Sequence, residues 1–123
     1  MLVVDDEVAI GRALRRILEC EHDVTLESDA RAALDRLARE TYDIVFCDLM
    51  MPNMSGMDFF DEVAARSPQV ASRIVFLTGG AFSPRSEEFL RQSTNECLAK
   101  PFSREAVSSA VRRMMGAADV RET

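Results

Sequence analysis

Two segments of four residues, 44–47 (IVFC) and 74–77 (IVFL), are apolar at every position. A strand inside a parallel sheet is covered on both faces, so its sequence is a continuous apolar run rather than an alternation of apolar and polar residues. Segments with apolar residues at helical spacing lie between and around these two runs. The combination predicts an α/β domain in which helices cover both faces of a parallel sheet.

The rest of the chain continues the alternation of strands and helices. Further short strands are predicted at residues 2–4, 24–26 and 97–99, so that five strands alternate with five helices. The third helix is expected to stop before Pro68, because the residue before a proline disfavours helical backbone. Residues that favour helix starts precede three of the helices, namely Asp29, Ser83 (followed by Pro84) and Ser103.

The length and composition are those of one soluble globular domain. The chain has 123 residues, of which 47% are hydrophobic and 29% are charged. We expect this domain over residues 1–117 and a fraying polar tail over residues 118–123. Because the first predicted strand begins at residue 2 with almost no lead-in, we also expect that the chain was cut from a longer protein.

Charge and hydrophobicity exclude several classes of partner. The net charge of −6 gives the domain no overall positive field, so we expect no direct binding of nucleic acid. No segment has the length and apolarity of a membrane span, and the start lacks the features of a signal peptide. Cys20, Cys47 and Cys97 are an odd number without a CxxC pair, which predicts reduced thiols in a cytoplasmic protein.

Polar residues follow four of the predicted strands, at the ends where ligands collect in parallel α/β sheets. Asp5 and Asp6 follow the first strand and Asp48 the third, while Thr78 follows the fourth and Lys100 the fifth. Three carboxylates at one sheet edge repel one another unless a cation shares the space. Mg²⁺ prefers oxygen ligands and commonly completes its shell with a phosphate oxygen. Mg²⁺ is therefore the predicted cofactor.

These residue types together suit phosphoryl transfer. A metal ion, the ammonium of Lys100 and the hydroxyl of Thr78 around one carboxylate would stabilise charge on the phosphoryl oxygens. Asp48 is the predicted nucleophile and would become an aspartyl phosphate. A single aspartate at a strand end is commonly only a solvated exit, but the presence of all five residues favours a site.

Four motifs carry a resemblance to a known family: VVDDE at 3–7, CDLMMPNMSG at 47–56, FLTGG at 76–80 and LAKPF at 98–102. Over nearly the whole chain, the sequence resembles the receiver domain of two-component response regulators. The resemblance implies a flavodoxin-like, doubly wound sheet of five parallel strands in the order 2-1-3-4-5, with five helices. It also implies that Asp48 takes a phosphoryl group from a histidine kinase, a histidine phosphotransfer domain or a small donor.

The resemblance further implies a metal site and a switch. Asp5, Asp6, Asp48 and the backbone carbonyl of Met50 would hold Mg²⁺. Thr78 and Lys100 would contact the phosphoryl oxygens.

In the family, these contacts shift the surface around the fourth helix and fifth strand. Members usually carry an aromatic residue three positions before the lysine, where this chain has Cys97. A switch through Thr78, Cys97 and Lys100 therefore does not have the usual aromatic side chain. Residues 93–96 (STNE) also replace the usual Gly-Ala pair, so we expect this loop to have its own shape.

Residues 78–90 and 95–102 look like receivers fused to the C-terminus of hybrid histidine kinases. On this interpretation the isolated domain is not an enzyme beyond promoting its own phosphorylation and dephosphorylation, while its parent chain is a kinase. The surface built around the fourth and fifth helices is a candidate for pairing with a second receiver. His22 is interpreted as a surface turn residue rather than a phosphotransfer histidine, because no helical-bundle pattern surrounds it.

Two other functions compete with this one. The first is a Mg²⁺-dependent phosphatase with an aspartyl nucleophile, but Met50 stands two positions after Asp48, where a second acid would be needed as a general acid. The second is a docking domain that never takes phosphate, which the altered region around Cys97 favours and the complete set of site residues disfavours.

Met50 and Gly80 also lack polar groups to hold an attacking water, so we expect both to affect the lifetime of the phosphoryl group.

Overall fold

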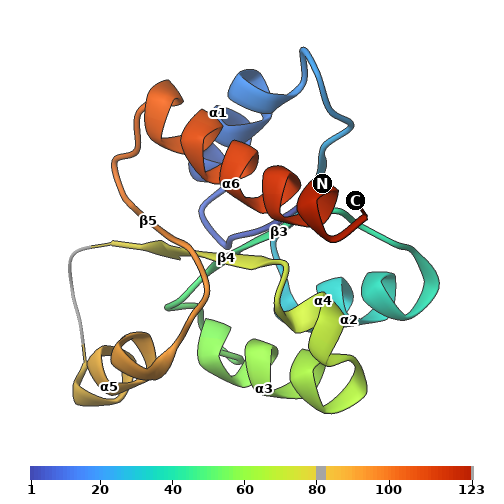
Figure 1. Cartoon of the computed structure of the whole chain (residues 1–123). Helices are drawn as coiled ribbons and strands as arrows, with labels where there is room; N and C mark the ends of the chain where they lie inside the picture. Colours follow the sequence, from blue (N-terminus) through green and yellow to red (C-terminus); the bar gives the residue numbers. More distant parts are fainter. Residues whose placement is uncertain (80–82, 123) are drawn as a thin grey trace.

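A computed structural model of the chain describes residues 1–79 and 83–122, with side chains as far as residue 116. Five parallel strands form one sheet in the order β2-β1-β3-β4-β5 (Figure 1). The strands are β1 (Leu2–Val4), β2 (Thr25–Glu27), β3 (Val45–Asp48), β4 (Ile74–Thr78) and β5 (Cys97–Ala99). The helices are α1 (Val8–Leu18), α2 (Ala30–Arg39), α3 (Gly56–Arg66), α4 (Pro68–Ala71), α5 (Pro84–Gln92) and α6 (Arg104–Glu122). The predicted fold class and strand order are confirmed.

The sheet separates two apolar cores. Helices α1 and α6 cover one face, and α2, α3, α4 and α5 cover the other (Figure 1). In β4, Phe76 belongs to the core beneath α3 and α5, while Val75 and Leu77 belong to the core beneath α1 and α6. Each face of the central strands is therefore buried, which is why their sequence is apolar at every position.

Helix starts carry the capping residues that the sequence predicts. The Asp29 side chain accepts a hydrogen bond from the backbone of Arg31, and Ser103 accepts one from the backbone of Ala106. Ser83 and Ser86 form a reciprocal capping box at the start of α5. These bonds satisfy backbone N–H groups that have no partner within the helix.

The structure has a sixth helix, so the prediction of five helices was wrong. Helix α4 spans four residues from Pro68, and Ser67 accepts a hydrogen bond from the backbone of Val70 at its start. Pro68 was expected only to stop α3, which does end at Arg66. A serine followed by proline also favours a helix start, and here the same dipeptide does both.

At the C-terminus, α6 is longer than its apolar stripe, since the backbone is helical to Glu122. Thr123 lies outside the described residues, and the domain limits of 1–117 and 118–123 remain predictions. Within the helices that the structure describes, none is long and apolar enough to cross a membrane.

The loop before β5 has a specific anchor. The side-chain amide of Asn95 donates to the carbonyl of Ala71 at 2.9 Å and to that of Ile74 at 2.8 Å. Ser93 accepts from the backbone N–H of Asn95. These contacts tie the loop to the start of β4, in a segment where the sequence analysis found no Gly-Ala pair.

Candidate functional site

The parallel register places the predicted site residues at one edge of the sheet. Asp48 ends β3 and pairs with Leu77, one position before the last residue of β4, Thr78. Thr78 pairs with Ala99, and Lys100 follows directly. Asp5 follows β1, which lies on the other side of β3. The carboxyl ends of β1, β3, β4 and β5 therefore bring residues distant in sequence together, at the left-hand edge of the sheet in Figure 1.

Three carboxylates form the centre of this site. Asp5, Asp6 and Asp48 each offer an oxygen, and these oxygens lie within 4.8 Å of one another. Asp5 and Asp48 are buried, each with 4% of its surface exposed, whereas Asp6 is exposed. The site thus has two desolvated acids and a third that faces water.

Lys100 lies among these acids. Its ammonium nitrogen is 2.9 Å from Asp5 Oδ2 and 3.4 Å from Asp48 Oδ1. A third carboxylate, Glu7, approaches the same nitrogen at 3.3 Å. Glu7 was not among the predicted site residues, although it directly follows the Asp5-Asp6 pair in sequence.

The electrostatics of the site follow from burial and from crowding of like charges. Burial, and then the charge of Asp5, raise the pKa of Asp48 to about 6, although Lys100 opposes the shift. Burial also raises the pKa of Asp5, despite its contacts with Glu7 and Lys100. For Lys100, burial lowers the pKa, but hydrogen bonding and attraction to the nearby carboxylates outweigh it and the net shift is upward.

The donor set fits a hard divalent cation. Asp5 Oδ2 is buried and has no hydrogen-bond donor among the described residues other than the ion-paired Lys100 ammonium, at 2.9 Å. A buried carboxylate oxygen without such a partner is costly. All the clustered ligands are oxygens, as Mg²⁺ prefers, and a cation here would offset the repulsion that raises the pKa of Asp48.

Thr78 lies at the same edge of the sheet, and its hydroxyl makes a weak hydrogen bond. It is buried, and its hydroxyl donates to the carbonyl of Leu98 over a long 3.5 Å. The backbone N–H of Lys100 donates to the Thr78 carbonyl at 2.7 Å, which ties the end of β4 to the end of β5. A movement of Thr78 would therefore displace the backbone of Lys100.

Two predicted positions lie outside the carboxylate group. Cys97 is exposed on β5 and pairs with Phe76, two residues before the strand end that carries Thr78. Met50 is 47% exposed, and its backbone N–H lies 3.5 Å from Asp48 Oδ1. Cys20, Cys47 and Cys97 are all free thiols, as predicted, and Cys47 is buried directly before Asp48 in β3.

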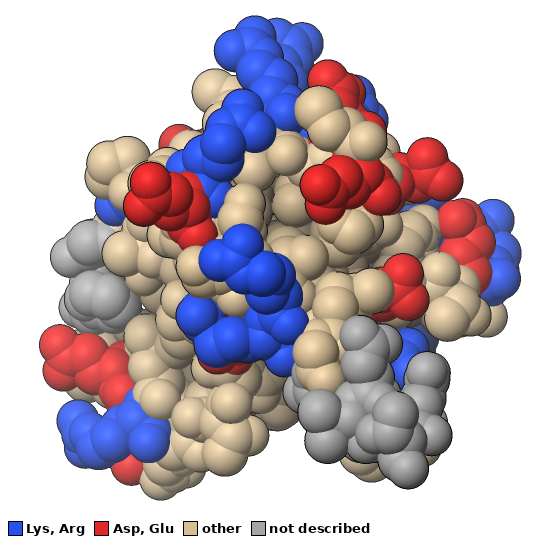
Figure 2. Space-filling view, turned by 45° about the horizontal axis from the view of Figure 1, so that its top comes forward, with Lys and Arg blue, Asp and Glu red and all other residues tan. Residues whose placement is uncertain are grey.

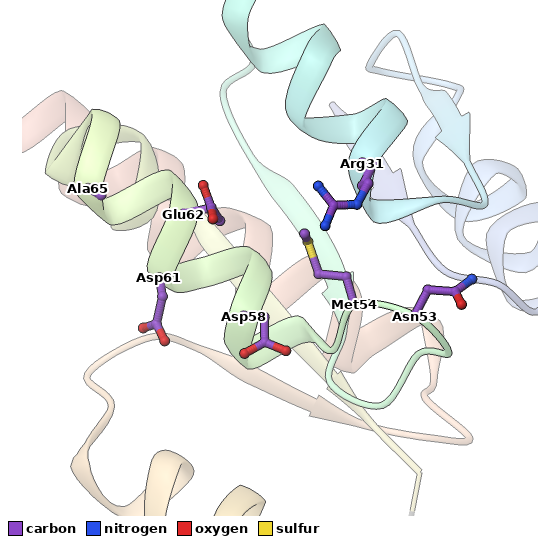
Figure 3. A pocket seen from close by; sticks show the side chains of 7 residues that line it. All are labelled: Arg31, Asn53, Met54, Asp58, Asp61, Glu62 and Ala65. Atoms are coloured by element: carbon purple, nitrogen blue, oxygen red, sulfur yellow. The ribbon is translucent and has the colours of Figure 1, made fainter.

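A separate cavity of about 390 Å³ lies between α2 and α3. Asp58, Asp61 and Glu62 line it from α3, and Arg31 reaches toward it from α2 (Figure 3). None of the predicted site residues lines it. Of its acids, Asp58 is already paired with Arg85 at 2.7 Å, a contact that lowers the pKa of Asp58.

The sequence matches a known protein family over most of its length. The family model described as "Response regulator receiver domain" matches residues 1–112. The chain belongs to this family. The receiver is 27% identical over 116 residues to "Response regulator ArlR" of Staphylococcus saprophyticus, covering 94% of this chain and 51% of that protein.

Other relatives agree with this assignment. The receiver is 30% identical to "Transcription factor SKN7" of Saccharomyces cerevisiae over 94% of this chain and 18% of that protein. It therefore spans about half the length of the first of these curated relatives and less than a fifth of the second. A crystal structure of a response regulator receiver domain protein from Clostridium thermocellum has a TM-score of 0.83 and 26% identity, covering 97% of this chain and 95% of that one.

The raised pKa of Asp48 predicts how the stability of the metal-free receiver depends on pH. Its pKa is about 6 when folded and about 3.9 when unfolded, so the folded state binds the proton more tightly. Stability falls as pH rises through this window. At pH 7.5 we expect the free energy of unfolding of Asp48→Asn to exceed that of the parent by about 1–2 kcal/mol. This range allows for the screening of the Asp48 charge by solvent at the open edge of the site.

The measurement is urea denaturation of the parent and Asp48→Asn in a chelator, at pH 4 and at pH 7.5. The difference between the two proteins should shrink at the lower pH, where Asp48 is protonated in the folded parent and about half protonated in the unfolded chain. A parent that is at least as stable as the variant at pH 7.5 would contradict the prediction that the ionised Asp48 carboxylate destabilises the folded state.

Proposed function

We propose that this receiver takes a phosphoryl group onto Asp48 from the phosphohistidine of a histidine kinase or a histidine phosphotransfer domain. The observation that carries the proposal is the burial of Asp48 beside both Lys100 and the acids Asp5 and Asp6. This arrangement gives one carboxylate a fixed cation on one side and a candidate metal site on the other. Asp5, Asp6, Asp48 and the backbone carbonyl of Met50 would hold Mg²⁺.

In the proposed reaction, a carboxylate oxygen of Asp48 forms a bond to phosphorus. The bond from phosphorus to the donor nitrogen breaks, and its electron pair stays with the donor imidazole. Lys100 donates a hydrogen bond to a phosphoryl oxygen, and Thr78 exchanges its long bond to Leu98 for another phosphoryl oxygen. When bound, Mg²⁺ supplies positive charge that stabilises the phosphoryl oxygens.

The same contacts would provide the switch. A bond from Thr78 to the phosphoryl group draws the end of β4 inward. Two residues earlier on β4, the ring of Phe76 packs edge-on against Phe89 of α5, with ring centroids 5.2 Å apart. Phe60 of α3 contacts both rings. We therefore place the output at the α5–β5 surface, where Cys97 is exposed, with the aromatic contact supplied by Phe89 rather than by residue 97.

The direct test is intact mass after incubation with Mg²⁺ and a small phosphoryl donor such as phosphoramidate. We expect the mass of one phosphoryl group to be added, to be lost on treatment with base, and to fail to appear when a chelator is present. Addition that is independent of divalent cation would contradict the metal site. No addition from either a small donor or a phosphorylated histidine protein, while Mg²⁺ still binds, would favour the docking-only alternative.

The phosphatase alternative makes a different prediction. A phosphatase would release many equivalents of product from an external ester such as p-nitrophenyl phosphate, whereas a receiver takes one phosphoryl group for itself. Met50 is half-exposed beside Asp48 and offers no proton to a leaving group. We expect no turnover of the ester, and sustained release would overturn the receiver assignment of this site.

Met50 is expected to lengthen the life of the phosphoryl group. Its thioether side chain is 47% exposed beside the phosphoacceptor and cannot orient an attacking water as an amide can. In Met50→Asn we expect dephosphorylation to accelerate by about tenfold, as one positioned hydrogen bond would supply. The measurement is the decay of the phosphorylated fraction after donor removal, with Met50→Leu as a control that keeps the parental rate. Gly80, the other residue given this role, lies outside the described residues.

The cellular setting is also proposed. We propose that the domain works in the cytoplasm as the C-terminal receiver of a hybrid histidine kinase, and that the surface built around α5 and α6 can pair with a second receiver. On the face that carries α1 and α6, Lys and Arg side chains are interspersed with Asp and Glu (Figure 2). Among the residues described on that face, acids therefore interrupt the positive charge, which does not favour nucleic-acid binding. The sequence of the surrounding gene tests the fusion.

A further inference from the structure

Lys100 contacts a third carboxylate besides the two buried acids of the site. Its ammonium nitrogen lies 2.9 Å from Asp5 and 3.4 Å from Asp48, and it donates a hydrogen bond to Glu7 Oε1 at 3.3 Å. Glu7 therefore shares the ammonium with the two buried acids, although neither the metal site nor the phosphoryl chemistry uses Glu7.

The backbone holds Glu7 firmly in this place. Glu7 is the N-cap residue of α1, its backbone N–H donates to Asp5 Oδ1 at 2.9 Å, and its carbonyl accepts from Ile10 and Gly11. Acids at an N-cap commonly accept hydrogen bonds from the helix, but the Glu7 side chain makes none. It reaches across to Lys100 instead, so the ion pair is not a by-product of helix capping.

The ammonium of a lysine side chain has three N–H donors and no acceptor. In the resting receiver, Asp5, Glu7 and Asp48 are the three acceptors around it. A phosphoryl oxygen can gain a donor from Lys100 only when one of these carboxylates gives one up. Glu7 costs least to release, because its side chain is 62% exposed and water can solvate it, whereas the Asp5 side chain is fully buried.

We propose that Glu7 is a positioning residue that competes with the phosphoryl group for Lys100 and so favours the resting state of the receiver. The inference rests on the proposed function, since it names the competitor of the incoming phosphoryl group. Glu7 also places a negative charge beside the path of an anionic donor, which adds to the competition. Removing this charge while keeping the shape of the side chain should favour the phosphorylated state.

The test compares the parent with Glu7→Gln and with Glu105→Gln as a matched control. Glu105 lies in the first turn of α6, is exposed and has no ion pair with the described residues. Both variants lose one negative charge, but only Glu7→Gln loses a contact with Lys100. A general effect of net charge would therefore be seen in both variants.

Lys100 gives this comparison a direct readout, because it is the only lysine in the sequence. Labelling with ¹⁵N-lysine gives a single side-chain Nζ resonance. In the metal-free proteins we expect Glu7→Gln to shift this resonance and Glu105→Gln to leave it unchanged. With Mg²⁺ and beryllofluoride, a stable mimic of the phosphoryl group, we expect Glu7→Gln to bind about two- to fivefold more tightly than the parent, the range that one exposed ion pair supplies. Phosphorylation by phosphoramidate should accelerate by a similar factor.

Several outcomes would overturn the proposal. Equal or weaker beryllofluoride binding in Glu7→Gln would show that Glu7 does not compete for Lys100. A tenfold loss of Mg²⁺ affinity in Glu7→Gln without beryllofluoride would make Glu7 a metal ligand instead. These results leave the proposed function intact, provided that the parent itself takes a phosphoryl group. A parent that binds neither beryllofluoride nor phosphoryl would contradict the proposed function, and the role of Glu7 would fall with it.

Discussion

Asp48→Asn is expected to gain no phosphoryl mass under conditions that phosphorylate the parent to a measurable fraction. An amide oxygen is a far poorer nucleophile than a carboxylate, and no neighbouring acid can replace it in the same position. Asp5 is buried against Lys100, and Asp6 faces water at the first strand. Loss of the acceptor should therefore remove the reaction entirely, rather than slow it as the loss of a supporting residue would.

The matched control is Asp58→Asn. Asp58 lies in the first turn of α3, and its carboxylate pairs with Arg85 outside the site. Asp58→Asn should be phosphorylated like the parent. Peptide mapping of the labelled parent should place the modification on the segment that contains Asp48. Phosphoryl mass on Asp48→Asn, at a level comparable with the parent, would mean that another side chain is the acceptor.

Gly56→Ala is expected to reduce the free energy of unfolding by about 3 kcal/mol or more, through steric overlap. A Cβ atom at this position would lie 2.4 Å from the carbonyl oxygen of Asp48 and 2.8 Å from Cα of Leu49. Both are backbone atoms at the end of a buried strand, so neither can move as a side chain could. The backbone N–H of Gly56 also donates to the Leu49 carbonyl at 2.8 Å, and a shift that relieved the overlap would break this bond.

Gly11→Ala provides the comparison for this prediction. Gly11 is buried in the interior of α1, and its added Cβ would meet only the Leu26 side chain, at 3.4 Å. Alanine there should be neutral or stabilising, by about 0.5–1 kcal/mol from helix propensity. Urea denaturation of the three proteins measures both effects. If Gly56→Ala were as stable as Gly11→Ala, the close approach of α3 to the Asp48 strand would be wrong.

The apolar runs in β3 and β4 predict the central strands because burial on both faces leaves no room for polar residues. Once the strands are parallel, their carboxyl ends must meet at one edge, so Asp48, Thr78 and Lys100 can be placed together without coordinates. Glu7 could not be found in this way. Its role depends on the direction of one side chain at the start of α1, which no strand pattern encodes.

Helix α4 was missed for a related reason. Its signal is a single serine-proline pair, which fits the end of one helix as well as the start of the next. Likewise, Asn95 sits in a loop without an obvious pattern, and its anchoring role depends on carbonyls that lie more than twenty residues away. Contacts between side chains and distant backbone are set by the assembled fold, so local sequence patterns do not reveal them.

The position of Lys100 determines how this protein can be attached to a surface. Because these 123 residues contain no other lysine, an amine reagent that modifies a side chain within them can modify only Lys100. Amine coupling at this side chain would therefore consume the group that we propose contacts the phosphoryl oxygens. Cys20, exposed just beyond the C-terminal end of α1, offers a thiol attachment point once Cys97, the other exposed thiol, has been replaced by serine.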